Sequence, residues 1–430
     1  MPGITRRRIL LGALGVATLS VAGRVTHQQL QAGPEGHSPY FRALSAALHD
    51  ANVARASMVI DRERASANLE RMLSQIRPDY HYRIVAKSLP SLDLLAWVMD
   101  RGRTDRLMLF NEPFLRQVSE RFPASDILMG KPLPVTAAEH FYRERNAASG
   151  FDPQHQLQWL IDTPERLAQY AELAEQRETP MRISIEIDVG LHRGGVTDTG
   201  VLGTMVTRIR DNPWLTFSGL MGYEAHIVKA PGSTQGHFDD AMTRYREFLE
   251  VAESASGVLR DQLILNTGGS TTYNLYPGTD VVPNEIAAGS AIVQPADFDI
   301  PTLSAHQPAA FIASPVLKAS DGLHLPGAPG VGKLLALWDR RYEQTFFIDR
   351  GNWKAVPASP DTLRFNPLYG RSSNQDMLNG PEDLGLSPGD FLFFRPTQSE
   401  AVLRQFGPLL VHDATGNRIV QRWAPFRIED

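Results

Sequence analysis

Apolar runs alternate with amphipathic stretches along the first two thirds of this 430-residue chain. The apolar runs are compatible with buried strands, and the stretches 63–76, 164–176 and 238–256 predict helices between them. Such alternation over about 240 residues is typical of a (β/α)8 barrel, although an open doubly wound sheet has the same periodicity. The predicted strands are 57–62, 82–88, 105–111, 125–133, 156–162, 181–188, 216–226 and 262–269.

The pattern changes after about residue 300, where short apolar runs are punctuated by Gly, Pro, Asp and Asn. This texture predicts an all-β domain that follows the barrel, and no internal repeat is apparent. We therefore expect a barrel over residues 53–300, a β-domain over 301–430, and a linker with a short helix over 26–52. The expected strands of the β-domain are 308–320, 332–339, 342–351, 389–396, 408–413 and 417–423.

Residues 1–25 have the features of an export signal rather than of a folded element. The basic cluster 6–8 precedes an apolar run over 9–23, which is short for a membrane span but fits a signal. The paired Arg6 and Arg7 behind Thr5 resemble a twin-arginine signal, with an ordinary secretory signal as the alternative. We expect export to the periplasm and no stable membrane span after signal removal, or a membrane-anchored protein if the signal is not cleaved.

Composition narrows the function classes. With 42% hydrophobic and 21% charged residues, the chain has the makeup of a globular protein with a sizeable core. A net charge of -5 without a basic stripe gives no reason to expect nucleic acid as a partner. The absence of cysteine excludes disulfides, thiolate nucleophiles and Cys-ligated zinc, and it suits an oxidising compartment.

The active site of a (β/α)8 barrel lies at the C-terminal ends of its strands, so polar residues at those ends are candidates. Lys87 ends an apolar run, where a lysine is rarely buried without a partner. The turn 266–273, "NTGGSTTY", has backbone N–H groups that could cradle a phosphate. In "EIDVGLHRGGV", 186–196, glycines bracket His192 and Arg193. The other candidates are Asp61, Arg62, Asn111, Lys131, Asp162, Thr163, Asp188, Tyr223, Glu224 and His226.

These motifs occur in the order seen in fold-type III pyridoxal-phosphate enzymes, the alanine racemase superfamily. The chain most resembles the D-threonine aldolase and D-serine dehydratase-like branch, from about residue 53 to the end. The stretches that carry the resemblance are "MVIDRERASANLERM", "VAKSLPS", "WLIDTPERL", "EIDVGLHRGGV", "GYEAH", "NTGGSTTYN" and "NEIAAGSAIV".

The resemblance implies roles for individual residues. Lys87 would form the Schiff base with pyridoxal 5'-phosphate, and Arg193 would contact the phenolic oxygen of the cofactor or tune its ring. His226, with Tyr223 beside it, matches a histidine at the cofactor face; a structural histidine is the alternative. The residues that would hold the phosphate are Gly268, Gly269, Ser270 and Thr271.

The β-domain departs from the branch at its metal site. Aldolase and dehydratase members carry a divalent metal on a His followed two residues later by Cys or Asp. Gln398 and Glu400 occupy these positions here. A neutral amide is a poor ligand and one carboxylate cannot hold a divalent metal alone, so the sequence does not support a metal site. Magnesium or manganese held by Glu400 and waters is the remaining alternative.

The resemblance implies a small D-amino acid or β-hydroxy amino acid as the substrate, and aldolase or dehydratase chemistry as the activity. A metal-independent racemase is one alternative, in which Tyr369 of the β-domain, usually supplied by a partner subunit, would be the second proton-transfer base. A non-catalytic pyridoxal-phosphate binding protein is another, and a sugar- or phosphate-processing barrel with an incidental lysine is a third. The resemblance also implies a homodimer.

Overall fold

The computed structural model describes residues 36–277, 281–328 and 330–427, which fall into two compact units. The barrel unit contains residues 60–310, 396–413 and the chain from 420. The β unit contains residues 36–59, 311–395 and 414–419 of the described chain. The chain therefore leaves the barrel unit and later returns to it. The predicted domain boundaries at 53 and 301 stay predictions.

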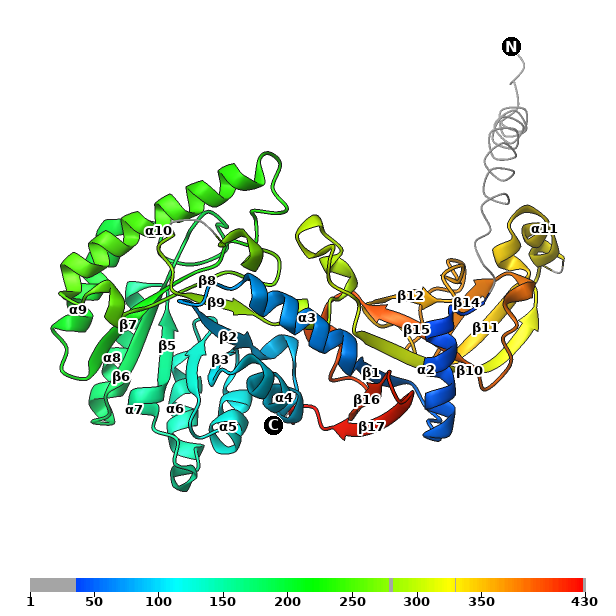
Figure 1. Cartoon of the computed structure of the whole chain (residues 1–430), viewed down its shortest axis with the longest axis horizontal. Helices are drawn as coiled ribbons and strands as arrows, with labels where there is room; N and C mark the ends of the chain where they lie inside the picture. The colour runs from blue at the N-terminus through cyan, green and yellow to red at the C-terminus, as the bar shows by residue number, and fades with distance from the viewer. Residues whose placement is uncertain (1–35, 278–280, 329, 428–430) are drawn as a thin grey trace, which may run out of the picture. The chain divides into compact units, whose positions relative to one another are not determined.

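Eight parallel strands close into a barrel in chain order, which confirms the predicted fold class. The first and last strands pair, with Tyr82 opposite Ile286, and close the ring (Figure 1). The barrel strands are β2 (His81–Val85), β3 (Arg106–Leu109), β4 (Asp126–Met129), β5 (Leu157–Ile161), β6 (Met181–Ile187), β7 (Leu215–Gly222), β8 (Ile264–Thr267) and β9 (Glu285–Ala288).

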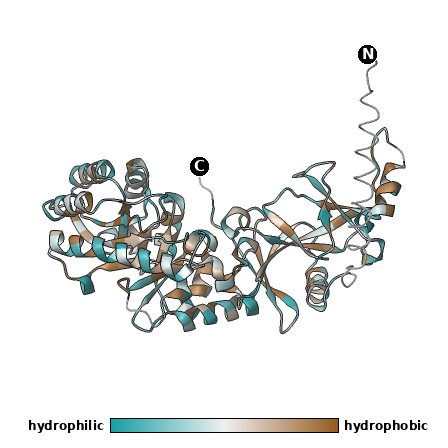
Figure 2. Cartoon of the chain, turned by 90° about the horizontal axis from the view of Figure 1, so that it is seen from above, coloured by the Kyte–Doolittle hydropathy of each residue, from teal (hydrophilic) through white to brown (hydrophobic). Residues whose placement is uncertain are grey.

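Amphipathic helices surround the ring, and polar positions on them alternate with apolar ones (Figure 2). Several begin where a short polar side chain accepts the N–H three residues on, as Asn111 does from Phe114 and Thr163 from Arg166. The helices of the barrel unit are α3 (Arg62–Gln75), α4 (Leu92–Gly102), α5 (Glu112–Arg121), α6 (Val135–Glu144), α7 (Pro153–Gln156), α8 (Pro164–Gln176), α9 (Thr199–Arg210), α10 (Thr234–Ser256) and α12 (Ser399–Val402).

The first predicted barrel strand was wrong. Residues Ser57–Asp61 form β1, which belongs to the other sheet, and the ring is closed by β9, which the sequence pattern missed. β1 is buried along its whole length, so its periodicity carries no information about its partner strand. Asp61 consequently does not end a barrel strand; it caps α3 by accepting the N–H of Arg64.

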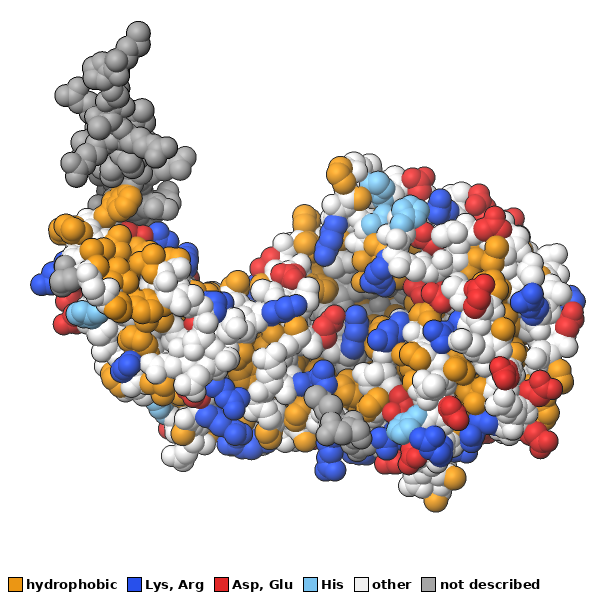
Figure 3. Space-filling model, turned by 180° about the vertical axis from the view of Figure 1, so that it is seen from behind, with side chains coloured by type: hydrophobic (Ala, Val, Ile, Leu, Met, Phe, Trp, Pro, Cys, Tyr) orange, Lys and Arg blue, Asp and Glu red, His pale blue; other side chains and the backbone are white. Residues whose placement is uncertain are grey.

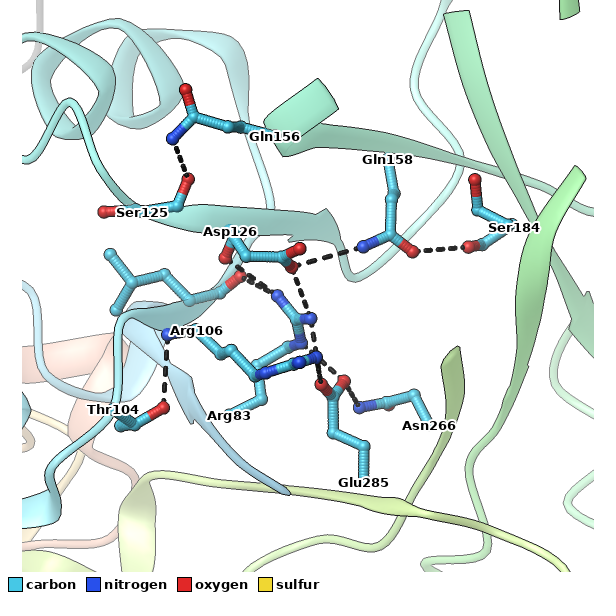
Figure 4. Close-up of polar contacts among 12 residues, drawn as sticks. Arg83, Thr104, Arg106, Ser125, Asp126, Gln156, Gln158, Ser184, Asn266 and Glu285 are labelled. Carbon is cyan, nitrogen blue, oxygen red and sulfur yellow. Dashed lines mark hydrogen bonds and ion pairs between the residues drawn. The ribbon is translucent and has the colours of Figure 1, made fainter. Parts of the chain in front are cut away.

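β9 was missed because it begins with a charged residue and contains two alanines, which are depleted in strands. Glu285 is fully buried, and a buried carboxylate needs partners. Arg83 and Arg106 supply them across the barrel interior, with Arg83 also bonded to Asp126 (Figure 4). Asn266 donates to the same carboxylate. Arg106, Asp126 and Glu285 are the first residues of their strands, so most of the network lies toward the N-terminal ends of the barrel strands.

The β unit is built from antiparallel strands. β10 pairs with β11 and β15, and β14 lies between β11 and β13. Its sheet contains β10 (Ala310–Asp321), β11 (Gln344–Asp349), β12 (Ala355–Ser359), β13 (Arg364–Phe365), β14 (Gln375–Gly380) and β15 (Phe391–Pro396), and the chain continues through β16 (Leu409–Asp413) and β17 (Arg418–Trp423).

Two helices accompany these strands, α2 (Pro39–Asp50) and α11 (Val331–Trp338). The prediction of a strand over 332–339 was wrong, because its Leu, Ala and Lys residues favour a helix and short apolar runs are ambiguous. Apolar side chains gather on the surface around α11, where Leu334 and Leu337 are exposed (Figure 3). Within the part of the chain that the structure describes, no helix combines the length and hydrophobicity of a membrane span. The predicted signal over 1–25 lies outside the described residues.

Candidate active site

A cavity of about 250 Å³ opens at the C-terminal ends of the barrel strands, where barrel enzymes carry their sites. Its size is close to the lower end of the roughly 300–1,000 Å³ range of small-molecule sites. The predicted residues that line it are Lys87, Arg193, Tyr223, Gly268, Gly269, Ser270 and Thr271, together with Gln398 and Glu400 from the segment that returns to the barrel unit.

Lys87 lies in a single 3-10 turn, Ala86–Ser88, directly after β2. The strand stops at Val85, so the lysine is not a buried strand residue, and its side chain is 39% exposed. Its Nζ lies 3.4 Å from Glu400 Oε1 and 4.7 Å from the centre of the Phe110 ring. The ammonium group therefore points into the cavity between a carboxylate and an aromatic face.

The turn after β8 presents backbone donors to the same cavity. Within the described part of the chain, the N–H groups of Gly269, Ser270 and Thr271 have no acceptor. Gly268 has a φ of +82°, a left-handed conformation that favours glycine. A Cβ on Gly269 would lie 3.0 Å from the Tyr223 ring. Three consecutive free donors in a turn that lines the cavity are suited to an anion, so we call residues 269–271 the anion cradle; its predicted role as a phosphate site stays a prediction.

The end of β9 holds this turn against the turn that carries Lys87. The Ser270 hydroxyl accepts the N–H groups of Gly289 and Ala291, at 3.1 and 3.0 Å. A Cβ on Gly289 would lie 2.6 Å from the carbonyl oxygen of Val85, so only glycine allows this approach. The Ser290 hydroxyl, beside it, donates to Ser88. The lysine and the cradle are thus held together by short contacts.

The loop after β6 places Arg193 at the cavity. Its guanidinium lies 4.9 Å from the centre of the Tyr223 ring. Asp188 organises the loop by accepting the N–H groups of Gly190 and His192 and by pairing with the His192 ring at 2.6 Å. Burial acts to raise the pKa of Asp188, but these hydrogen bonds hold it below its ordinary value. Asp188 therefore orients the loop that carries Arg193.

Glu186 is a buried acid beneath the same loop. Burial raises the pKa of its carboxyl to about 7, the nearby Asp162 and Asp188 charges act in the same direction, and Arg193 opposes them. Its ionisation consequently depends on pH near neutrality, a property that no sequence pattern had indicated.

Two predicted catalytic residues do not line the cavity. His226 lies against Gly190, where an added Cβ would be 3.0 Å from its Nε2, and its buried Nδ1 finds no partner among the described residues. Burial and the neighbouring His237 lower the pKa of His226. Tyr369 belongs to the β unit, is 44% exposed, and donates its hydroxyl to the His324 carbonyl. The predicted roles of both residues stay predictions.

The positions that correspond to the metal ligands are engaged by neighbouring side chains. Gln398 donates to Asp297 at 3.1 Å, while Glu400 pairs with Lys87. Across the described ranges, no group of three or more His, Asp or Glu residues is placed to hold a metal ion. Asp297 and Lys229 also line the cavity and were not predicted, because each is an isolated residue outside any motif.

The site thus brings together a lysine after the first barrel strand and three free backbone N–H groups after the seventh. The chain belongs to the family described as alanine racemase, N-terminal domain, whose sequence model matches residues 60–294, more than half of the chain. The resemblance that the motifs indicated is therefore confirmed.

Known proteins similar to this chain include aldolases and dehydratases as well as alanine racemases. A D-threonine aldolase from an Arthrobacter species is 28% identical over 144 residues, which cover 32% of this chain and 36% of that protein. The chain thus matches only about a third of that relative's length. A D-threonine aldolase structure from Filomicrobium marinum has a TM-score of 0.67 at 13% identity and covers 91% of this chain and 97% of that one. A D-threo-3-hydroxyaspartate dehydratase structure from Delftia sp. HT23 has a TM-score of 0.67 at 16% identity, over 87% and 97% of the two chains.

Proposed function

We propose that this chain is a pyridoxal-phosphate-dependent lyase that acts on small D-amino acids or β-hydroxy amino acids. The observation that carries the proposal is the juxtaposition of the Lys87 amine and the free N–H groups of 269–271 in one cavity of an alanine racemase family barrel. The similarity to D-threonine aldolase supports the choice of substrate class.

The residues present fit the cofactor. Lys87 offers an accessible amine for a Schiff base, and the N–H groups of Gly269, Ser270 and Thr271 offer the donors that a phosphate requires. Arg193 adds a cation at the cavity wall. When bound, pyridoxal phosphate supplies an electron sink for the negative charge that develops on the amino acid.

Glu400 is the acid–base group that this chain places beside the lysine. Aldol cleavage needs a base that removes the β-hydroxyl proton, whereas dehydration needs an acid that protonates the departing hydroxyl. One carboxyl group can do either, and Glu400 Oε1 lies 3.4 Å from Lys87 Nζ. Glu400 stands at a position where the branch carries a metal ligand. Because its carboxyl could handle the proton without a metal, this location favours a metal-independent lyase.

A metal-independent racemase is the second candidate. It is favoured by the replacement of the His-x-Cys/Asp pair with Gln398 and Glu400. In this reaction Tyr369 would act as a second base supplied from a partner subunit, so the racemase proposal also requires a homodimer. A chain that binds the cofactor without turnover is the third candidate. We further propose that the protein is exported to the periplasm by a twin-arginine signal.

The test begins with purified protein and added pyridoxal phosphate. We expect visible absorption of a lysine-bound cofactor, borohydride trapping on the peptide that contains Lys87, and loss of both in Lys87→Ala. D-threonine, D-serine and D-alanine are then assayed for aldehyde, keto acid and the opposite enantiomer, with manganese and with a chelator. Aldehyde or keto acid supports the lyase, and enantiomer alone supports the racemase. Cofactor binding without any product would contradict both enzyme proposals.

A further inference from the structure

Glu224 is a fully buried acid with an unusual set of partners. It follows β7, next to Tyr223, and forms no ion pair with any lysine, arginine or histidine of the described residues. A buried carboxylate without a cation is costly unless hydrogen bonds satisfy its oxygens. Burial raises the pKa of Glu224, and the hydrogen bonds that it accepts, the first of them from Thr272, oppose this rise.

Glu224 bonds to the residues that flank the anion cradle, and it also interacts with the Tyr276 hydroxyl beyond the turn. Oε2 accepts the Thr267 hydroxyl at 3.0 Å and the Gly268 N–H at 3.2 Å. Oε1 accepts the Thr272 hydroxyl at 2.6 Å. Thr267 and Gly268 stand before the three free N–H groups and Thr272 stands after them, so one side chain holds both ends of the turn.

The neighbouring residue reinforces this arrangement from the cavity side. The Tyr223 ring lies against Gly269, the first residue of the cradle. Glu224 does not line the cavity, whereas the cradle residues do. The Glu224 carboxylate therefore accepts the Gly268 N–H, while the next three N–H groups remain available to a ligand.

We propose that Glu224 is a positioning residue that holds the turn 267–272 in the shape that binds a phosphate group, without touching the ligand. This inference rests on the proposed cofactor site, and it assigns the function of an acid that neither a Schiff base nor proton transfer uses. Ligands with a phosphate group depend on Glu224, and ligands that reach only Lys87 do not.

The experiment compares pyridoxal 5'-phosphate, pyridoxal and inorganic phosphate on the wild type and on variants of the full chain. Glu224→Met keeps the side-chain length and removes both acceptors. We expect it to weaken pyridoxal-phosphate binding about tenfold to a hundredfold, because hydrogen bonds to a charged group are lost. Pyridoxal binding, measured by borohydride trapping at Lys87, should change less than about threefold, since it depends little on these bonds.

Two further variants keep the inference testable if Glu224→Met folds poorly. Glu224→Gln retains an oxygen for the Gly268 N–H and can donate to Thr272, so it should bind pyridoxal phosphate within about threefold of the wild type. Thr272→Val removes the hydroxyl that donates to Glu224 Oε1, so it should weaken pyridoxal-phosphate binding in the same direction as Glu224→Met but to a smaller extent. Asp376→Asn is the control, because Asp376 is a fully buried acid of the β unit that binds Arg371 and lies outside the cavity lining.

Inorganic phosphate provides a readout that is independent of the lysine. It should raise the melting temperature of the wild type, Glu224→Gln and Asp376→Asn, and have little effect on Glu224→Met. Equal losses for pyridoxal phosphate and pyridoxal, or no loss for either, would overturn the inference even if the enzyme turns over substrate. A wild type that binds neither phosphate nor the cofactor would overturn the inference and the cofactor proposal together. If the wild type binds both without catalysis, only the proposed activity fails.

Discussion

The local structure around Lys87 differs from the one that the sequence pattern suggested. In the sequence it ends an apolar run, but the strand stops two residues earlier and a 3-10 turn carries the lysine into the cavity. Its charge is balanced by Glu400, whose side chain is 41% exposed. An ion pair between partly exposed groups contributes little to stability, and the location of Glu400 beside the amine is consistent with the acid–base role proposed above.

The pH dependence of stability should depend on Glu186. The folded pKa of about 7 lies above the ordinary value of 4.5, so the neutral form is favoured by folding. Its stabilising contribution is complete below pH 4.5 and is lost as the pH rises through 7. Relative to Glu186→Gln, the wild type should therefore lose about 2.5 kcal/mol of unfolding free energy between pH 5 and 8.

Urea unfolding at pH 5, 6, 7 and 8 measures this difference. Glu175→Gln, on the exposed face of α8, is the control and should change stability equally at every pH. A constant difference between the wild type and Glu186→Gln would contradict the prediction.

The affinity of the site for a divalent metal should depend on the residues at positions 398 and 400. Gln398→His combined with Glu400→Asp restores the His-x-Asp pair, and imidazole with carboxylate is a far better ligand set than an amide with one carboxylate. We expect the double variant to bind manganese about tenfold or more tightly than the wild type in calorimetry. Gln398→Ala with Glu400→Asp, which lacks the imidazole, should not. Tight manganese binding by the wild type would contradict this expectation.

Among the elements, β9 depends most on a long-range partner. Its first residue, Glu285, is a buried charge at the start of a strand, and Arg83 of β2 pairs with it at 2.5 Å (Figure 4). The same guanidinium bonds to Asp126 at the start of β4. The network therefore connects the strand that closes the ring with the first and third strands.

Removal of Arg83 should be among the most destabilising substitutions in the barrel. Arg83→Met leaves two carboxylates without their main cation, and breaking a buried ion pair in this way costs about 3–5 kcal/mol. Arg106→Met is the matched control, because the Arg106 side chain is 22% exposed and, among the described residues, bonds only to Glu285, so about 1–2 kcal/mol is expected. Urea unfolding measures both, and an Arg83→Met loss no larger than that of Arg106→Met would refute the role of the network.

At the scale of the whole molecule, the N-terminal segment predicts that the protein is exported. The twin-arginine prediction depends on Arg6 and Arg7, and that pathway accepts folded proteins, which suits a protein that loads its cofactor before export. Arg6→Lys with Arg7→Lys should therefore retain the protein in the cytoplasm at unchanged total yield, as measured by cell fractionation. Substitution of Arg8 alone by Lys is the control. Periplasmic accumulation of the double variant would favour an ordinary secretory signal.

Much of this protein follows from local sequence. The bounds of α8, and within one residue those of α3, were predictable because they depend on periodicity and capping residues close together in the chain. Strand lengths were not: the strand predicted over 125–133 covers only Asp126–Met129. Lys87, Arg193 and Tyr223 were predictable because strand ends meet at one face of a barrel. By contrast, β1 was wrongly predicted to belong to the barrel and β9 was missed. Strand pairing depends on long-range contacts, which the sequence of a buried run does not specify.

Only the tertiary structure determined which polar residues line the cavity and which lie close to one another. Gln398 and Glu400 reach the cavity because the chain returns to the barrel unit more than 300 residues after Lys87, and His226 does not line the cavity although its motif matched. The raised pKa of Glu186 and the clamp made by Glu224 also depend on burial and distance. The sequence by itself thus determined the fold class and the candidate lysine, whereas packing determined which acids surround the cradle, because desolvation and hydrogen-bond geometry exist only in the folded chain.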